Sequence, residues 1–183
     1  MDSPPPVRRR RPFLAPIWLV VLLVLVAAAV VAVVYRSAGT TTFIVVPSAE
    51  SSLGSIRDAP LSAEGEQRAD QLAQLFGAAG TAGRIAAIYV TSMRRTQQTA
   101  APLAARLGLE PVVVAGQPAE ATVAQALRSY RGETVMIVSS AVADVVEALT
   151  GISLPAQSSE AYGSIYIVSD PMFGSPGIVV LHY

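Results

Sequence analysis

The stretch Phe43-Ile44-Val45-Val46-Pro47-Ser48-Ala49-Glu50 decides the fold, because an apolar strand in it runs directly into a polar turn. The strand's four residues are all apolar, without the alternation of a strand that has one face in water. Such a strand is covered on both faces, as in the parallel sheets of α/β proteins. Ligands of these sheets lie beyond the carboxyl ends of the strands. Pro47, Ser48 and Glu50 therefore occupy the position of a functional loop.

The rest of the chain alternates between strand and helix patterns. We expect strands at 43–46, 85–90, 111–114, 134–138, 164–168 and 178–182, and helices at 63–76, from within 91–100 to 107, at 122–130 and at 141–149. Ser62 and Gly108 suit the two ends of helices. Alternating strands and helices imply an α/β three-layer sandwich with a mostly parallel sheet, and the last two strands imply an antiparallel edge.

An N-terminal segment precedes this domain. Residues 1–16 form a Pro- and Arg-rich tail, 17–35 contain no charge, 36–42 form a polar linker, and 43–183 form the domain. The 19 residues of Ile17–Tyr35 would span roughly 28 Å as a helix, close to the thickness of a bilayer's hydrocarbon core. We therefore predict one transmembrane helix. A cleavable signal peptide is the alternative, but its apolar region is shorter and Arg36-Ser37-Ala38 is a poor cleavage site.

The arginines predict the orientation of this helix. Four of them, Arg8–Arg11, precede the apolar segment, and only Arg36 follows it closely. Positive charge remains on the cytoplasmic side of membrane proteins. We thus expect a single-pass protein with a cytoplasmic N-terminus and an extracytoplasmic, or periplasmic, C-terminal domain.

The composition excludes several kinds of function. Thirteen basic residues balance thirteen acidic ones, so there is no general electrostatic attraction for nucleic acid. The chain has no cysteine, which excludes thiolate chemistry and zinc–thiolate sites, and it has one histidine, His182. We predict no metal and no cofactor.

Polar residues follow three of the predicted strands, and their spacing resembles a known family. They are Pro47-Ser48-Ala49-Glu50, the segment Ser92–Ala100 with Pro102-Leu103-Ala104, and Ser139-Ser140; the turn Asp58–Ser62 with Glu64-Gly65 accompanies them. Over about 41–168 the chain resembles the histidine phosphatase superfamily, which includes phosphoglycerate mutases and phosphohistidine phosphatases. Ser92–Ala100 is the closest part of this match.

The resemblance implies that the catalytic groups are replaced. Pro47 and Ser48 stand where the family has an arginine and the nucleophilic histidine, and Ser140 stands in place of the second histidine. The family mechanism phosphorylates an imidazole, and a serine hydroxyl needs an adjacent base or metal to act as a nucleophile. Losing one good donor already costs on the order of 100- to 1000-fold in rate. We therefore expect a pseudoenzyme.

The resemblance also implies which site residues remain: Glu50, Asp58, Ser92 and Arg95. Arg95, Ser92 and Arg57 are candidates for binding an anion, while Glu50 and Asp58 are candidate acids or pairing groups. Each has a simpler interpretation. Arg95 could pair with Glu50 or Asp58, and Arg57 could be a solvated loop arginine. Ser140 is better interpreted as a helix cap than as a ligand contact.

We predict a membrane-held, catalytically inactive domain that binds phosphate, another small anion or a protein partner at the cell envelope. The first alternative is a phosphoester hydrolase with Ser48 as nucleophile and Glu50 or His182 as its base. The second is a purely structural envelope domain.

Overall fold

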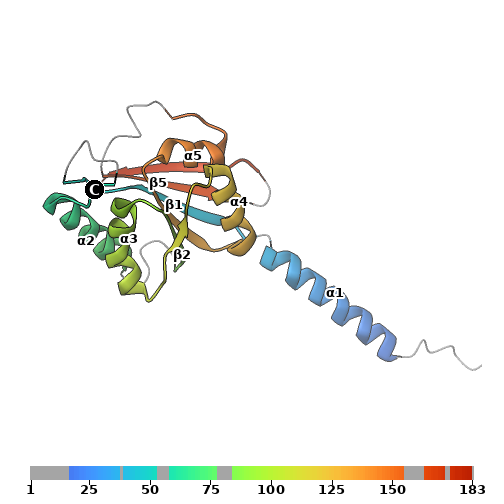
Figure 1. The fold of residues 1–183 in the computed structure, drawn as a ribbon. Coiled ribbons are helices and arrows are strands. Elements are labelled where there is room, and N and C mark those ends of the chain that lie inside the picture. The colour runs from blue at the N-terminus through green and yellow to red at the C-terminus, as the bar shows by residue number, and fades with distance from the viewer. Residues whose placement is uncertain are drawn as a thin grey trace, which may run out of the picture. The chain divides into compact units, whose positions relative to one another are not determined.

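The computed structural model describes residues 17–37, 39–52, 58–77, 84–154, 163–171 and 174–182, and within 32–37 it describes the backbone alone. The chain divides into two units, with the boundary between Arg36 and Ser37. The first unit contains helix α1 (Ile17–Ser37) except for its last residue (Figure 1). The described side chains of this helix are exposed. Within the described ranges, no helix combines the length and the apolarity that crossing a membrane requires. The predicted tail, 1–16, lies outside the described residues.

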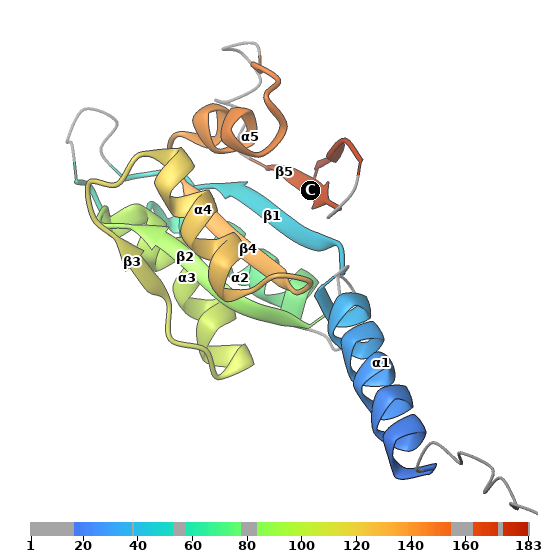
Figure 2. The same ribbon diagram turned by 90° about the vertical axis from the view of Figure 1, so that its right-hand side faces the viewer.

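The second unit is built on a six-stranded sheet with the order β3-β2-β4-β1-β5-β6. Its strands are β1 (Thr41–Pro47), β2 (Ile85–Thr91), β3 (Val112–Val114), β4 (Thr134–Ser139), β5 (Ser164–Asp170) and β6 (Gly177–His182). The first four run parallel, β5 runs antiparallel to β1, and β6 runs antiparallel to β5 (Figure 2). The prediction of an α/β fold with a mostly parallel sheet and an antiparallel edge is therefore confirmed.

Helices cover both faces of the sheet (Figure 1). Helices α2 (Ala63–Gly77) and α3 (Arg94–Leu107) contribute to one core cluster, and α4 (Ala119–Ser129) and α5 (Val142–Thr150) contribute to the other. Strand β1 serves both clusters: Phe43 and Val45 face α4 and α5, whereas Ile44 and Val46 face α2 and α3. All four side chains are fully buried, which explains why the strand is apolar without alternation.

Two helix ends show how local sequence sets the boundaries. Helix α4 begins at Ala119, three residues before the predicted start, because the extended Pro118 precedes it and accepts the amide of Thr122. Helix α3 continues through Pro102 and ends at Gly108. Gly108 has a left-handed φ of 66° and donates its amide to the last turn, as predicted for this position.

Candidate functional site

The ends of β1 and β4 bring Ser48 and Ser140 close together. Pro47 lies opposite Ser139 in the parallel ladder, and the amide of Ser48 donates to the carbonyl oxygen of Ser139 at 3.3 Å. Ser48 and Ser139 are buried, whereas Ser140 is exposed. Ser48 and Ser140, the two serines that the resemblance places at histidine positions, therefore lie at neighbouring strand ends, on the carboxyl side of the sheet.

The first turns of α3 pack against the same edge. The hydroxyl of Ser140 lies 3.7 Å from the sulfur of Met93, the residue that precedes α3. From the other side, the amide of Ala49 donates to the hydroxyl of Thr99 at 3.0 Å. That hydroxyl in turn donates to the carbonyl oxygen of Arg95 at 2.6 Å. Ser48, Ser140 and the beginning of α3 thus form one cluster, which we call the strand-end site.

The turn before α2 supports the loop that follows β1. The amide of Ser62 donates to the carbonyl oxygen of Glu50 at 2.9 Å, and the hydroxyl of Ser62 accepts the amide of Gly65 at 3.1 Å. The predicted capping role of Ser62 is therefore confirmed. The amide of Leu61 donates to the side chain of Gln98 at 2.9 Å, which ties the same turn to α3.

Both predicted acids already have partners. The Glu50 carboxylate forms a two-bond ion pair with Arg68 of α2, at 2.6 and 3.0 Å. The carboxylate of Asp58 accepts the backbone amide of Arg94 at 2.7 Å and so satisfies the start of α3. Arg95 is half-buried and pairs with neither acid, nor does its guanidinium bond to any other described residue. The simpler interpretation of Arg95 is therefore wrong.

The other candidates are placed as follows. The N-cap of α5 is Ala141, and no side chain caps this helix, so the capping role predicted for Ser140 is wrong. The hydroxyl of Ser139 instead accepts the amide of Ala141 at 3.0 Å within the turn before the helix. Ser92 is exposed, and Arg57 lies outside the described residues. His182 is on β6, where its Nδ1 lies 3.1 Å from the hydroxyl of Ser164.

Ser164 also contacts the phenol of Tyr166. Burial raises the pKa of Tyr166, and the hydrogen bond with Ser164 lowers that pKa in part. The imidazole of His182 is thus engaged within the β5–β6 pair, and β6 is the second strand from β1 and the third from β4.

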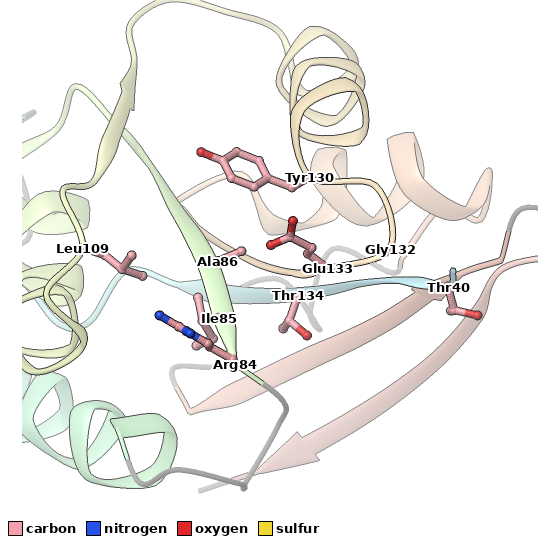
Figure 3. Close-up of a pocket in the computed structure, with 9 residues that line it drawn as sticks. All are labelled: Thr40, Arg84, Ile85, Ala86, Leu109, Tyr130, Gly132, Glu133 and Thr134. Carbon is pink, nitrogen blue, oxygen red and sulfur yellow. The ribbon is translucent and has the colours of Figure 1, made fainter. Parts of the chain in front are cut away.

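Two cavities lie at opposite ends of the parallel strands. One of about 180 Å³ lies at the carboxyl ends of β2 and β4, on the side of α4 and α5; Thr91, Ser140 and Asp144 are among its lining residues, whereas Ser48 and Arg95 are not. A larger one, of about 520 Å³, is at the amino ends of β2 and β4 (Figure 3). Its two charged side chains, Arg84 and Glu133, are exposed and opposite in sign, so it offers no net charge to an anion. We place the candidate site by its side-chain chemistry, not by cavity size.

Sequence reasoning missed the supports of the site: Arg68, Met93, Gln98 and Thr99. Gln98 and Thr99 belong to the segment that carries the family resemblance, and that was the available signal. The sequence offered no signal for Arg68, because its partner is 18 residues away in another element.

The comparisons with known proteins agree with this geometry. The model of the histidine phosphatase superfamily (branch 1) matches residues 39–118, which include Ser48, Glu50, Asp58 and Arg95 but not Ser140. No curated protein matches the sequence.

Three solved structures illustrate the likeness in fold. SixA of Nakamurella multipartitia, described as a phosphohistidine phosphatase, has 18% identity and a TM-score of 0.56, over 79% of this chain and 97% of that one. The mycobacterial glucosyl-3-phosphoglycerate phosphatase has 16% identity and a TM-score of 0.57, over 79% and 98%. A His-to-Ala variant of phosphoserine phosphatase from Entamoeba histolytica, in complex with phosphoserine, has 16% identity and a TM-score of 0.60, over 76% and 95%.

Identities this low show the fold alone, but the family model independently covers the first half of the domain. The chain therefore has the fold of these phosphatases, and its residues 39–118 are similar to the histidine phosphatase superfamily.

Proposed function

We propose that the domain binds phosphate or a phosphomonoester at the strand-end site and does not hydrolyse it. The proposal rests on which charged side chains of the site already have a partner and which do not. Glu50 and Asp58 are engaged by Arg68 and by the amide of Arg94, whereas the guanidinium of Arg95 has no partner among the described residues. A half-buried, unpaired arginine beside strand ends is suited to bind an anion with two parallel hydrogen bonds.

The absence of hydrolysis follows from the surroundings of Ser48. A serine hydroxyl becomes a nucleophile only with a base or a metal beside it. The two candidate bases are engaged elsewhere, Glu50 with Arg68 and His182 with Ser164. This arrangement favours binding over the alternative of a serine-based hydrolase.

A structural neighbour supports binding without a full set of histidines. The phosphoserine phosphatase variant in which a histidine is replaced by alanine holds phosphoserine in its solved structure. That fold therefore keeps a phosphomonoester when one histidine is lost. By analogy, the present domain would hold such a group, or a phosphorylated protein partner, through Arg95.

We expect inorganic phosphate to raise the melting temperature of the full chain in detergent. At ten times the Kd, the gain is about 1.4 kcal/mol, or roughly 3–6 °C for a domain of this size. Arg95→Ala should remove most of this shift, because it removes a half-buried guanidinium that no described residue pairs. Thermal unfolding followed by circular dichroism measures the effect.

Arg94→Ala is the matched control, since it removes the same charge from the adjacent position, where the side chain is exposed. It should retain the phosphate shift. Equal losses in both variants, or an equal shift with chloride at the same ionic strength, would count against a site at Arg95. A chain that responds to no anion would instead support the purely structural role.

We also expect no turnover of an aryl phosphomonoester above that of buffer. Ser48→Ala should leave this background unchanged, because Glu50 and His182, the two candidate bases, are both engaged with other residues. Release of the phenol followed by absorbance measures it. Turnover that disappears in Ser48→Ala would establish the hydrolase alternative and overturn the inactive assignment.

We further propose, from the sequence, that residues 17–35 hold the domain at a membrane, with the N-terminus in the cytoplasm. The chain has no cysteine, so single cysteines report topology without background. A membrane-impermeant maleimide should label Ser175→Cys in intact cells and Ser3→Cys only after permeabilisation. Labelling in the reverse pattern, or release of the chain from membranes by alkaline carbonate, would contradict the proposal.

A further inference from the structure

Strand β6 presents an open edge of the sheet. It pairs with β5 through six consecutive residue pairs without a register shift, and no strand of the described residues pairs with its other side (Figure 2, red). Such an edge carries backbone N–H and C=O groups that can bond to another strand. Proteins usually protect an edge with a charge, a proline, a bulge or a short strand. The sequence Gly177-Ile178-Val179-Val180-Leu181-His182 contains no proline and no lysine or acid.

The opposite edge of the sheet is different, because β3 has only three residues. Short edge strands offer little template for pairing. The contrast indicates that the open edge at β6 is a feature of this strand and not of the sheet as a whole.

The side chains of β6 are apolar on both faces and exposed. Val179 and Leu181 are 56% and 45% exposed, beside Ile167 and Ile165 of the α2/α3 face. Val180 is 42% exposed on the other face, opposite Tyr166. Among the residues of β6, only Ile178 packs against a core cluster of the described chain. A partner strand would therefore bury apolar surface on both sides as well as complete the ladder.

We propose that the occupant is β6 of a second copy of this chain, paired antiparallel about a two-fold axis. A two-fold axis perpendicular to the sheet keeps each face on its own side, so Val179 and Leu181 of one copy meet the same residues of the other. Residues opposite each other then share a face, and the axis passes through Val180, so that Val179 of one copy lies opposite Leu181 of the other. The strand carries no formal charge, so the pairing meets no like-charge repulsion.

The segments of this chain outside the described residues are less suited than a second β6 to pair with this edge. Its segments outside the described residues are rich in proline, glycine, serine or arginine, which are poor strand formers. The longest, 1–16, holds Pro4–Pro6 and Arg8–Arg11. The eight residues 155–162 include Pro155 and Glu160, and both ends of this segment are fixed by α5 and β5.

The size of the contact predicts a weak dimer. Six residues on each side are far fewer than the roughly 20–30 per side of a stable interface. The association should therefore depend on concentration, and confinement of both copies to one surface would favour it. The inference does not rest on anion binding at the strand-end site.

Single cysteines in the cysteine-free full chain test this pairing. In detergent and in membranes, Val179→Cys and Val180→Cys should give a cross-linked dimer of twice the chain mass on mild oxidation or with a short bismaleimide. Val113→Cys is the matched control, because Val113 is also an exposed edge-strand valine, at 50%, but lies on β3. Equal cross-linking of the control, no cross-linking of either β6 variant, or a product with another protein would overturn the proposal.

Sedimentation gives an equilibrium readout that does not depend on cross-linking. The full chain in detergent should show a concentration-dependent monomer–dimer equilibrium. Leu181→Lys should weaken it about tenfold or more, because the two-fold axis places a lysine ammonium of each copy on the same face at the contact. Val113→Lys should leave the equilibrium unchanged. A chain that stays monomeric, or a dimer that Leu181→Lys does not weaken, would overturn the pairing through β6.

Discussion

Gly65→Ala is expected to lower the free energy of unfolding of the domain by about 3 kcal/mol. A Cβ atom at Gly65 would lie 2.2 Å from the carbonyl oxygen of Glu50 and 3.2 Å from its carbonyl carbon and amide nitrogen. These are backbone atoms of the loop that follows β1, and the same oxygen accepts the amide of Ser62. The Glu50 carboxylate is also paired with Arg68 on α2. The loop cannot move away without breaking bonds to the helix that carries the new methyl group.

Gly77→Ala is the matched control in the same helix. Its Cβ would also meet an atom at 2.2 Å, but that atom is Cδ of Arg106, in a flexible side chain. We expect a change within about 1 kcal/mol, with a small gain possible because alanine favours the helix. Urea unfolding followed by circular dichroism measures both, with unchanged m-values as a check on the two-state comparison. Equal losses in the two variants would show that the close approach to Glu50 is not the cause.

Much of the fold could be predicted because it depends on local patterns. The burial of β1 follows from four successive apolar residues, and the left-handed end of α3 follows from Gly108. The start of α4 was missed for a related reason. Its first turn, Ala119-Glu120-Ala121, lacks the apolar spacing on which the prediction relied, and the start is set by Pro118.

The site was less predictable, because its pairings depend on which of two similar neighbours faces inward. The sequence contains Arg94 and Arg95 side by side, and only the folded chain shows that the Arg94 side chain is exposed, with its amide bonded to Asp58, while the Arg95 side chain is half-buried. Ser139 and Ser140 pose the same problem. Ser139 is the last residue of β4 and turns inward to accept the amide of Ala141, whereas Ser140 is exposed.

Thr99→Val is expected to lower the free energy of unfolding by about 2 kcal/mol. The hydroxyl of Thr99 is buried, accepts the amide of Ala49 and donates to the carbonyl oxygen of Arg95. Valine keeps the shape but leaves the buried amide of Ala49 without its acceptor, and an unsatisfied buried donor costs about 1–3 kcal/mol. Because Ala49 follows Ser48, the substitution should also reduce the stabilisation of the domain by phosphate.

Thr122→Val provides the control for this change. Thr122 is also a buried helical threonine, but its hydroxyl donates to the carbonyl oxygen of Pro118, and no described amide depends on it. We expect a loss of under about 1 kcal/mol, measured by the same urea unfolding. Similar losses in both variants would mean that the bond to Ala49 contributes little. A much larger loss for Thr99 would give a physical reason for the closest part of the family resemblance. The side chains of Gln98 and Thr99 accept the backbone amides of Leu61 and Ala49 and so hold the two loops of the site. This role does not require a catalytic histidine.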